Sequence, residues 1–235
     1  ERGARREDLL TPLDHTAPGK KRSEEWWQIY EAPYKEQYHS TRFVTERTQQ
    51  FIKESCEGDE PWMALCSYPD PHHPICPPGP WFDLHNPDDM LLPQSRHDPL
   101  EHAPAHLRLF QGVHPAKQRD WVAPCGFGND RLLSQAIAAT YGMIEMVDEG
   151  VGQILRQLEE LGVRDNTIIV FTSDHGDMMV DHGLFLKGFM HYRGTLQVPL
   201  IIDAPGMPAL RSCGLSSSID IAPTLLELCS LAGYD

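Results

Sequence analysis

The sequence lacks two features that would place it in a specialised class of protein. It contains no run of about 18 apolar residues, the length that a membrane-spanning helix requires, so we expect no membrane span. It is also poor in positive charge: 20 Lys and Arg stand against 34 Asp and Glu, a formal net charge of −14. Because the phosphates of nucleic acids select basic surfaces, this balance argues against a nucleic-acid partner and against a membrane-surface role.

Cysteine is scarce, with 6 in 235 residues and no C-x-x-C pair. Disulfide frameworks are typical of small, cysteine-dense secreted domains, so we expect mostly free thiols. The chain opens with ERGARREDLL, which is not a signal peptide. This favours a cytoplasmic location, although a segment preceding this sequence could carry a leader. The sequence leaves the oligomeric state open.

Apolar periodicity predicts alternating helices and buried strands. The expected elements are helices at residues 40–54, 129–162 and from about 220, and strands at residues 61–68, 166–174 and 198–205. Ser40 or Thr41 is expected to cap the first helix. The repetition of helix and buried strand predicts an α/β fold, with a mostly parallel sheet flanked by helices on both faces.

The stretch TSDHGDMMVDHG follows the predicted strand TIIVF and concentrates acidic and imidazole side chains. In open α/β sheets, ligands gather at the carboxyl ends of the strands. Asp174 and His175 are expected to face one divalent cation there, because the following glycine relaxes the backbone. Two ligands are half a site, and a polar surface loop is the alternative. We interpret Asp177, Asp181 and His182 as structural.

Two other segments carry polar groups at or near strand ends. His72 and His73 stand between prolines in PHHP, which restrict their backbone, and a histidine there could bind an ester oxygen or protonate a leaving group. Lys187 lies twelve residues after His175 and could neutralise an anionic substrate. Taken singly, PHHP is more often a rigid loop and Lys187 a solvated charge. Their occurrence together favours a functional site, although composition does not name its reaction.

The order of these motifs resembles that of the sulfatase family of the alkaline phosphatase superfamily. Between Tyr141 and Gly206 the chain carries V-F-T-S-D-H-G-D, then D-H-G, then K-G before an aromatic residue, then V-P-L-I-I-x-x-P-G. The D-P-H-H-P motif, and a histidine where many sulfatases have asparagine, resemble the arylsulfatase and phosphonate monoester hydrolase branch. The resemblance covers roughly Phe51 to Leu228 and implies an alkaline-phosphatase-like fold that is incomplete in this chain.

The resemblance implies metal-dependent hydrolysis of a sulfate ester, with a phosphonate or phosphate ester as the alternative substrate. The metal is usually calcium in sulfatases and often manganese in the phosphonate hydrolase branch. Asp174 and His175 match two of the family's metal ligands, and Lys187 matches the lysine that binds the substrate anion. His72 matches the histidine of the H-x-P motif that contacts the ester, whereas His73 occupies the variable position of that motif.

The chain departs from the family pattern at the nucleophile. The family uses a formylglycine made from a C-x-P-x-R or C-x-A-x-R motif, and neither Cys76 nor Cys125 lies in such a motif. We therefore expect residues 1–235 to be a partial sulfatase catalytic domain. The formylglycine would belong to a preceding segment, and a C-terminal subdomain would follow. A catalytically inactive relative that serves as a binding module is the alternative from another class.

Overall fold

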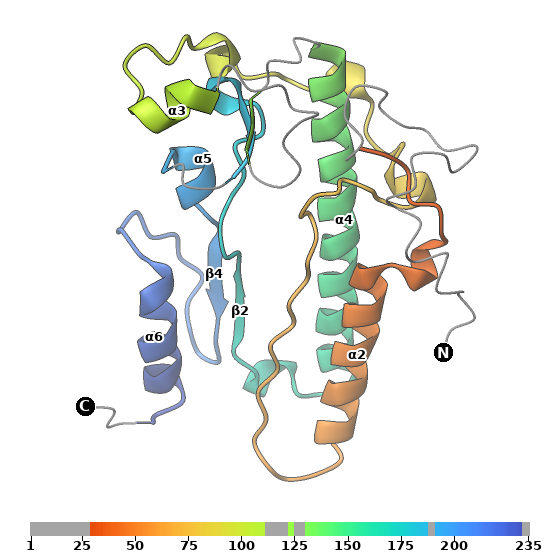
Figure 1. The fold of residues 1–235 in the computed structure, drawn as a ribbon. Helices are drawn as coiled ribbons and strands as arrows, with labels where there is room; N and C mark the ends of the chain where they lie inside the picture. Colours follow the sequence, from red (N-terminus) through yellow and green to blue (C-terminus); the bar gives the residue numbers. More distant parts are fainter. Residues whose placement is uncertain (1–28, 111–121, 125–129, 188–190, 232–235) are drawn as a thin grey trace.

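The computed structural model describes residues 29–110, 122–124, 130–187 and 191–231. The helices are α2 (Ser40–Ser55), α3 (Ala105–Phe110), α4 (Asp130–Glu160), α5 (Arg193–Leu196) and α6 (Ile221–Leu228). The strands are β1 (Val122–Pro124), β2 (Ile169–Thr172), β3 (Leu184–Leu186) and β4 (Leu200–Asp203). Figure 1 shows the β2–β4 pair between α6 on one side and α4 with α2 on the other. This mixture of helices and strands agrees with the predicted α/β class.

The long helix α4 is the element against which much of the chain packs. Its apolar positions recur with the helical period, as predicted, and 12 of its 31 residues are buried. Gly162 ends it in the left-handed conformation, with φ of 69°, where glycine costs least. The amides of Gly162 and Val163 then donate to the carbonyls of Glu159 (2.9 Å) and Leu158 (3.0 Å). The helix therefore stops where the sequence predicted.

Helix α2 packs along α4 through polar contacts as well as apolar ones (Figure 1). Arg42 of α2 donates to Glu149 of α4 at 3.1 Å. The predicted cap of α2 was wrong by one residue: His39 precedes the first turn, and its Nδ1 accepts from the amide of Thr41 at 3.4 Å. An imidazole nitrogen thus takes the place of the hydroxyl oxygen expected from Ser40 or Thr41.

Both described ladders are antiparallel, unlike the mostly parallel sheet that we predicted. Strand β2 pairs with β4, with Ile169 opposite Asp203, and β1 pairs with β3. A parallel neighbour needs a long crossover, usually helical. Between β2 and β4 the described helical elements are short, one turn of 3-10 helix and the four-residue α5. For this reason, the alternation of helices and strands in the sequence led us to expect more parallel pairing than the described strands have.

The predicted strand at residues 61–68 has no regular secondary structure. A strand needs a neighbour to satisfy its backbone groups, and no described residue forms a ladder with this segment. Met63 and Leu65 are 79% and 85% exposed. Among the described residues, this apolar segment is therefore not buried as we expected.

The main core joins the first half of α4 to a segment that follows β2. Val180, Phe185 and Leu186 are at most 3% exposed and pack with apolar residues of α4 and with Ile29, Ile75 and Phe82. A smaller cluster joins Leu100, Leu107, Met178 and Leu184. The residues on either side of the buried segment, 174–177 and 187, are thereby held at the edge of the core.

The described cysteines agree with the expectation of mostly free thiols. All five are free: Cys56, Cys66, Cys76, Cys213 and Cys229. The sixth, Cys125, lies outside the described residues. Among the helices that the structure describes, none has both the length and the apolarity needed to cross a membrane.

The close approach of α4 to the turn at Trp81 makes Gly142 a sensitive position. A Cβ at Gly142 would lie 2.0 Å from the Trp81 carbonyl oxygen. We expect Gly142→Ala to lower the free energy of unfolding of the 235-residue chain by about 1–3 kcal/mol, because backbone must move to relieve the overlap. Urea denaturation measures this.

The control for that experiment is Gly152→Ala in the same helix. A Cβ there meets only the mobile end of Arg156, at 3.3 Å. This change should be neutral or stabilise the chain by up to about 1 kcal/mol, since alanine is the better helix former. Equal effects of the two substitutions would contradict the close contact between Gly142 and Trp81.

Candidate active site

The segment between β2 and Lys187 folds back on itself between buried anchors. The amide of Met178 donates to the carbonyl of Leu186 at 2.8 Å, and the amide of Gly176 donates to the carbonyl of Thr195 at 2.8 Å. Met178 is 1% exposed and Leu186 3%. These bonds close the segment into a loop, here called the DHG loop (residues 173–187). Its polar residues at 174–177 and 187 consequently share one side.

Gly176 is needed in this loop because the backbone of another segment approaches it closely. A Cβ at this position would lie 1.9 Å from the carbonyl oxygen of Gly194. Its φ is not positive, so conformational freedom, the reason we gave from the sequence, is not what requires glycine here. The contact fixes the loop directly after Asp174 and His175.

Asp174 and His175 point their available atoms toward each other. Asp174 Oδ1 accepts from the His175 amide at 2.9 Å, and His175 Nδ1 lies 2.9 Å from the Gly176 carbonyl. A carbonyl only accepts, so Nδ1 carries the hydrogen and Nε2 presents its lone pair. That Nε2 atom is 3.4 Å from Asp174 Oδ2. Although partial burial opposes it, the hydrogen bonds from the His175 amide and the Ser173 hydroxyl lower the pKa of Asp174 and keep it ionised.

The spacing of these two atoms suits a shared cation. Two ligand atoms bound at about 2.4 Å to one Ca²⁺ and at right angles lie about 3.4 Å apart. Both side chains are accessible, at 81% exposed for Asp174 and 43% for His175. Among the residues that the structure describes, no group of three or more His, Cys, Asp or Glu could hold a metal ion. The pair therefore fits one side of a metal site.

Lys187 is half-buried, and two carboxylates influence it. Burial lowers the pKa of Lys187, and the negative charges of Asp177 and Asp174 oppose this effect. Burial also raises the pKa of Asp177, against the effects of the Met179 amide and of Lys187. Asp177 Oδ1 accepts from that amide at 3.2 Å, which agrees with its predicted role in the turn. Its second role, as a counter-charge to Lys187, was missed from the sequence because it depends on the closure of the loop.

The two histidines of PHHP form a stacked pair beside Lys187. Their ring centroids are 4.1 Å apart with an interplanar angle of 24°. His72 is exposed, and its Nδ1 lies 2.6 Å from the His73 carbonyl. His73 is half-buried; burial, with the nearby charges of His72 and Lys187, lowers its pKa to about 4. Of the two histidines, it is His73 whose pKa responds to the charge of Lys187.

Asp181 and His182 serve as scaffold, as predicted, although their partners are side chains rather than loop backbone. His182 Nδ1 is 2.7 Å from Asp98 Oδ2, and its ring stacks on Tyr192 at 4.3 Å. Asp181 accepts from the Ser95 hydroxyl. These contacts tie the DHG loop to residues 95–98, which belong to no recognisable motif in the sequence.

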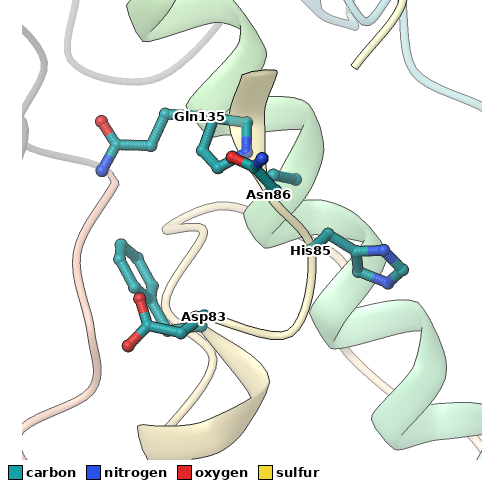
Figure 2. Close-up of a pocket in the computed structure, with 7 residues that line it drawn as sticks. Asp83, His85, Asn86 and Gln135 are labelled. Atoms are coloured by element: carbon teal, nitrogen blue, oxygen red, sulfur yellow. The ribbon is translucent and has the colours of Figure 1, made fainter. Parts of the chain in front are cut away.

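A pocket in the described part of the chain lies elsewhere. It has a volume of about 300 Å³ and is lined by Phe82, Asp83, His85, Asn86, Pro87, Gln135 and Ala138. Figure 2 shows the His85 ring directed away from Asp83, and its Nε2 lies 2.8 Å from Glu145. None of the residues predicted to form the site lines this pocket. The predicted site residues lie instead in the DHG loop and in PHHP.

Residues 12–231 match the family described as Sulfatase. The chain belongs to the sulfatase family. An arylsulfatase of Clostridium perfringens is 32% identical over 206 residues, which cover 85% of this chain and 40% of that protein. A multifunctional alkaline phosphatase superfamily protein of Trinickia caryophylli is 28% identical over 94% of this chain and 43% of its own length.

The solved structures support the same assignment. The phosphonate monoester hydrolase SpPMH from Silicibacter pomeroyi has a TM-score of 0.73 and 26% identity, over 85% of this sulfatase-family chain and 40% of that structure. This confirms the predicted membership of the alkaline phosphatase superfamily and the predicted fold class. The chain spans about 40% of the length of these relatives.

The position of His73 generates a titration prediction. We expect its pKa, followed by NMR on the 235-residue chain labelled in histidine, to be about 4. An unfolded histidine titrates near 6.5, so the unfolded chain binds the proton first, and stability should fall as the pH drops from about 6.5 to 4.

Lys187→Met tests the contact behind this shift. Removing the ammonium should raise the pKa of His73 while burial still keeps it below about 6.5. Lys53→Met, at an exposed lysine of α2, should leave it unchanged. An unaltered His73 pKa in Lys187→Met would show that PHHP and the DHG loop do not meet.

Proposed function

We propose that the whole protein hydrolyses sulfate esters with the aid of a divalent cation. The observation that supports this proposal is that Lys187 acts electrostatically on both Asp174 and His73, in a chain of the sulfatase family. Each group alone has an ordinary structural explanation. Together they would provide two metal ligands, a cation for the substrate and a histidine for proton transfer.

The Asp174–His175 pair would hold the cation, either calcium or manganese. The donor set of one carboxylate and one imidazole is acceptable to both metals. A bound divalent cation polarises the transferring group and favours the ionised form of a nucleophile. Further ligands and a formylglycine nucleophile would come from sequence outside residues 1–235.

Lys187 and His72 would act on the substrate itself. The Lys187 ammonium would stabilise the anionic sulfate oxygens, and partial burial strengthens that attraction because water screens it less. With Nδ1 directed at the His73 carbonyl, His72 keeps Nε2 free to hold the proton that the leaving oxygen needs.

Phosphonate or phosphate esters are the second candidate substrates. SpPMH, similar to this chain, is described as a phosphonate monoester hydrolase, and the Trinickia relative as multifunctional. An anion site formed by one lysine and a metal discriminates weakly between these tetrahedral anions. A third candidate, an inactive binding module, is suggested by the absence of the C-x-P-x-R and C-x-A-x-R motifs in this sequence.

The substrate-binding roles are tested with Lys187→Ala and His72→Ala in the whole protein. We expect kcat/KM for nitrophenyl sulfate to fall about 10²- to 10³-fold in each, because each change removes a group that stabilises the transition state. The same assay on a nitrophenyl phosphonate ranks the two substrate classes. Lys53→Ala is the matched control and should leave both rates unchanged; wild-type rates in Lys187→Ala and His72→Ala would refute the proposal.

The metal role is tested by calorimetry with Ca²⁺ and Mn²⁺. Asp174→Asn should weaken binding to the whole protein at least about tenfold, since a carboxylate ligand becomes a neutral amide. Asp165→Asn, at an exposed carboxylate after α4, should not. The isolated 235-residue chain should bind either metal weakly and show no turnover. Turnover by that chain alone would contradict the assignment of the nucleophile to another segment.

A further inference from the structure

The PHHP loop is held from both ends by buried contacts that the proposed function does not use. At its far end, Tyr30 donates its amide to the carbonyl of Ile75 at 3.2 Å, next to the bridge between Ile29 and Ile75. At its near end, the carboxylate of Asp70 reaches the start of α2. His72 and His73 lie between these two attachments.

Asp70 is held by a side chain from the first turn of α2, beside the residue that caps this helix. The Thr41 hydroxyl donates to Asp70 Oδ2, and Nδ1 of the cap residue His39, which accepts from the Thr41 amide, lies 3.3 Å from the same oxygen. The side chains of Asp70 and His39 are only 7% and 2% exposed. Burial raises the pKa of Asp70 and lowers that of His39, against their mutual attraction. The structure thus keeps two ionisable groups in surroundings that disfavour charge on either.

Such a buried polar arrangement is a poor way to stabilise a fold. Desolvating a carboxylate and an imidazole costs several kcal/mol, and well-packed apolar residues of similar size are often at least as stable. The polar contact instead fixes an orientation, because a hydrogen bond holds the Asp70 carboxylate in one position relative to α2. Asp70 is two residues before His72, and the amide of His72 donates to Pro69 at 3.0 Å across the same turn. The orientation of Asp70 therefore constrains the position of His72.

We propose that Asp70, held by the Thr41 hydroxyl, is a positioning residue that sets the place of the His72 imidazole. This inference rests on the proposed function, in which His72 serves the leaving group. Asp70 and its partners are buried and do not touch the substrate. They act by fixing the turn that carries the stacked His72–His73 pair.

The test uses two buried threonines one turn apart on α2. Thr41→Val removes the hydroxyl that donates to Asp70, at little change in shape, and Thr41→Ser restores it. The control is Thr45→Val, because Thr45 is equally buried but contacts Tyr68 (3.0 Å) and the Thr41 carbonyl (2.9 Å) instead of Asp70. All variants are made in the whole protein.

For Thr41→Val we expect kcat for nitrophenyl sulfate to fall about 10- to 100-fold with a smaller change in KM, because a misplaced catalytic group costs this much. Thr41→Ser should recover most of the loss, and Thr45→Val should keep kcat within a factor of about 2, although both valine variants lower Tm. Equal losses of kcat in the two valine variants, or none in Thr41→Val, would overturn the inference.

A second readout does not depend on turnover. Diethyl pyrocarbonate modification of His73, followed by mass spectrometry with the exposed His97 as internal reference, reports how well the stacked pair covers that ring. Thr41→Val should make His73 react several-fold faster, and Thr45→Val should not. If the wild-type protein shows no turnover while His73 still responds in this way, the proposed function fails but the positioning role of Asp70 stands; an unchanged rate removes the positioning role.

Discussion

The hydrogen bond from the Met178 amide to the Leu186 carbonyl governs the geometry of this chain, because it closes the DHG loop. Between these residues the backbone is buried against α4, and Val180 and His182 adopt positive φ values of 79° and 52°. A β-branched residue rarely accepts such a conformation. Tight packing of Val180, at 0% exposed, compensates for it. Asp177 and Lys187 flank the closing bond, so burial of the residues between them leaves their charges close enough to affect each other's pKa.

Charge balance gives the DHG loop a further constraint. The chain carries a formal net charge of −14, and two carboxylates, Asp174 and Asp177, influence the ammonium of Lys187. On the open face of this loop the described side chains alone are a poor binding site for an anion, because negative charge outweighs positive. A divalent cation at Asp174 and His175 would reverse that balance. In the proposed function, the metal would therefore attract the substrate electrostatically as well as take part in the reaction.

Much of the secondary structure could be predicted because it depends on local pattern. The α4 helix follows from a long apolar period ended by Gly162, and β2 from a β-branched run. The motifs around Asp174 and Lys187 were also visible, since each lies next to a strand. Contacts between distant segments could not be predicted this way. The pairing of His182 with Asp98 and the close approach of Gly176 to Gly194 join residues whose local sequences carry no sign of each other.

The segment before PHHP shows how local pattern and contacts between distant segments combine. Residues 61–68 have the composition of a strand covered on both faces, yet Met63 and Leu65 are largely exposed and the segment pairs with no described strand. The segment is nevertheless attached to α2 by side chains, because Tyr68 contacts Thr45 at 3.0 Å and the Trp62 ring meets Phe51 edge to face. The loop that carries the stacked His72–His73 pair is attached to α2 as well, through Asp70, and to Tyr30 through Ile75. Contacts between distant segments therefore order this part of the chain where no described strand pairs with it.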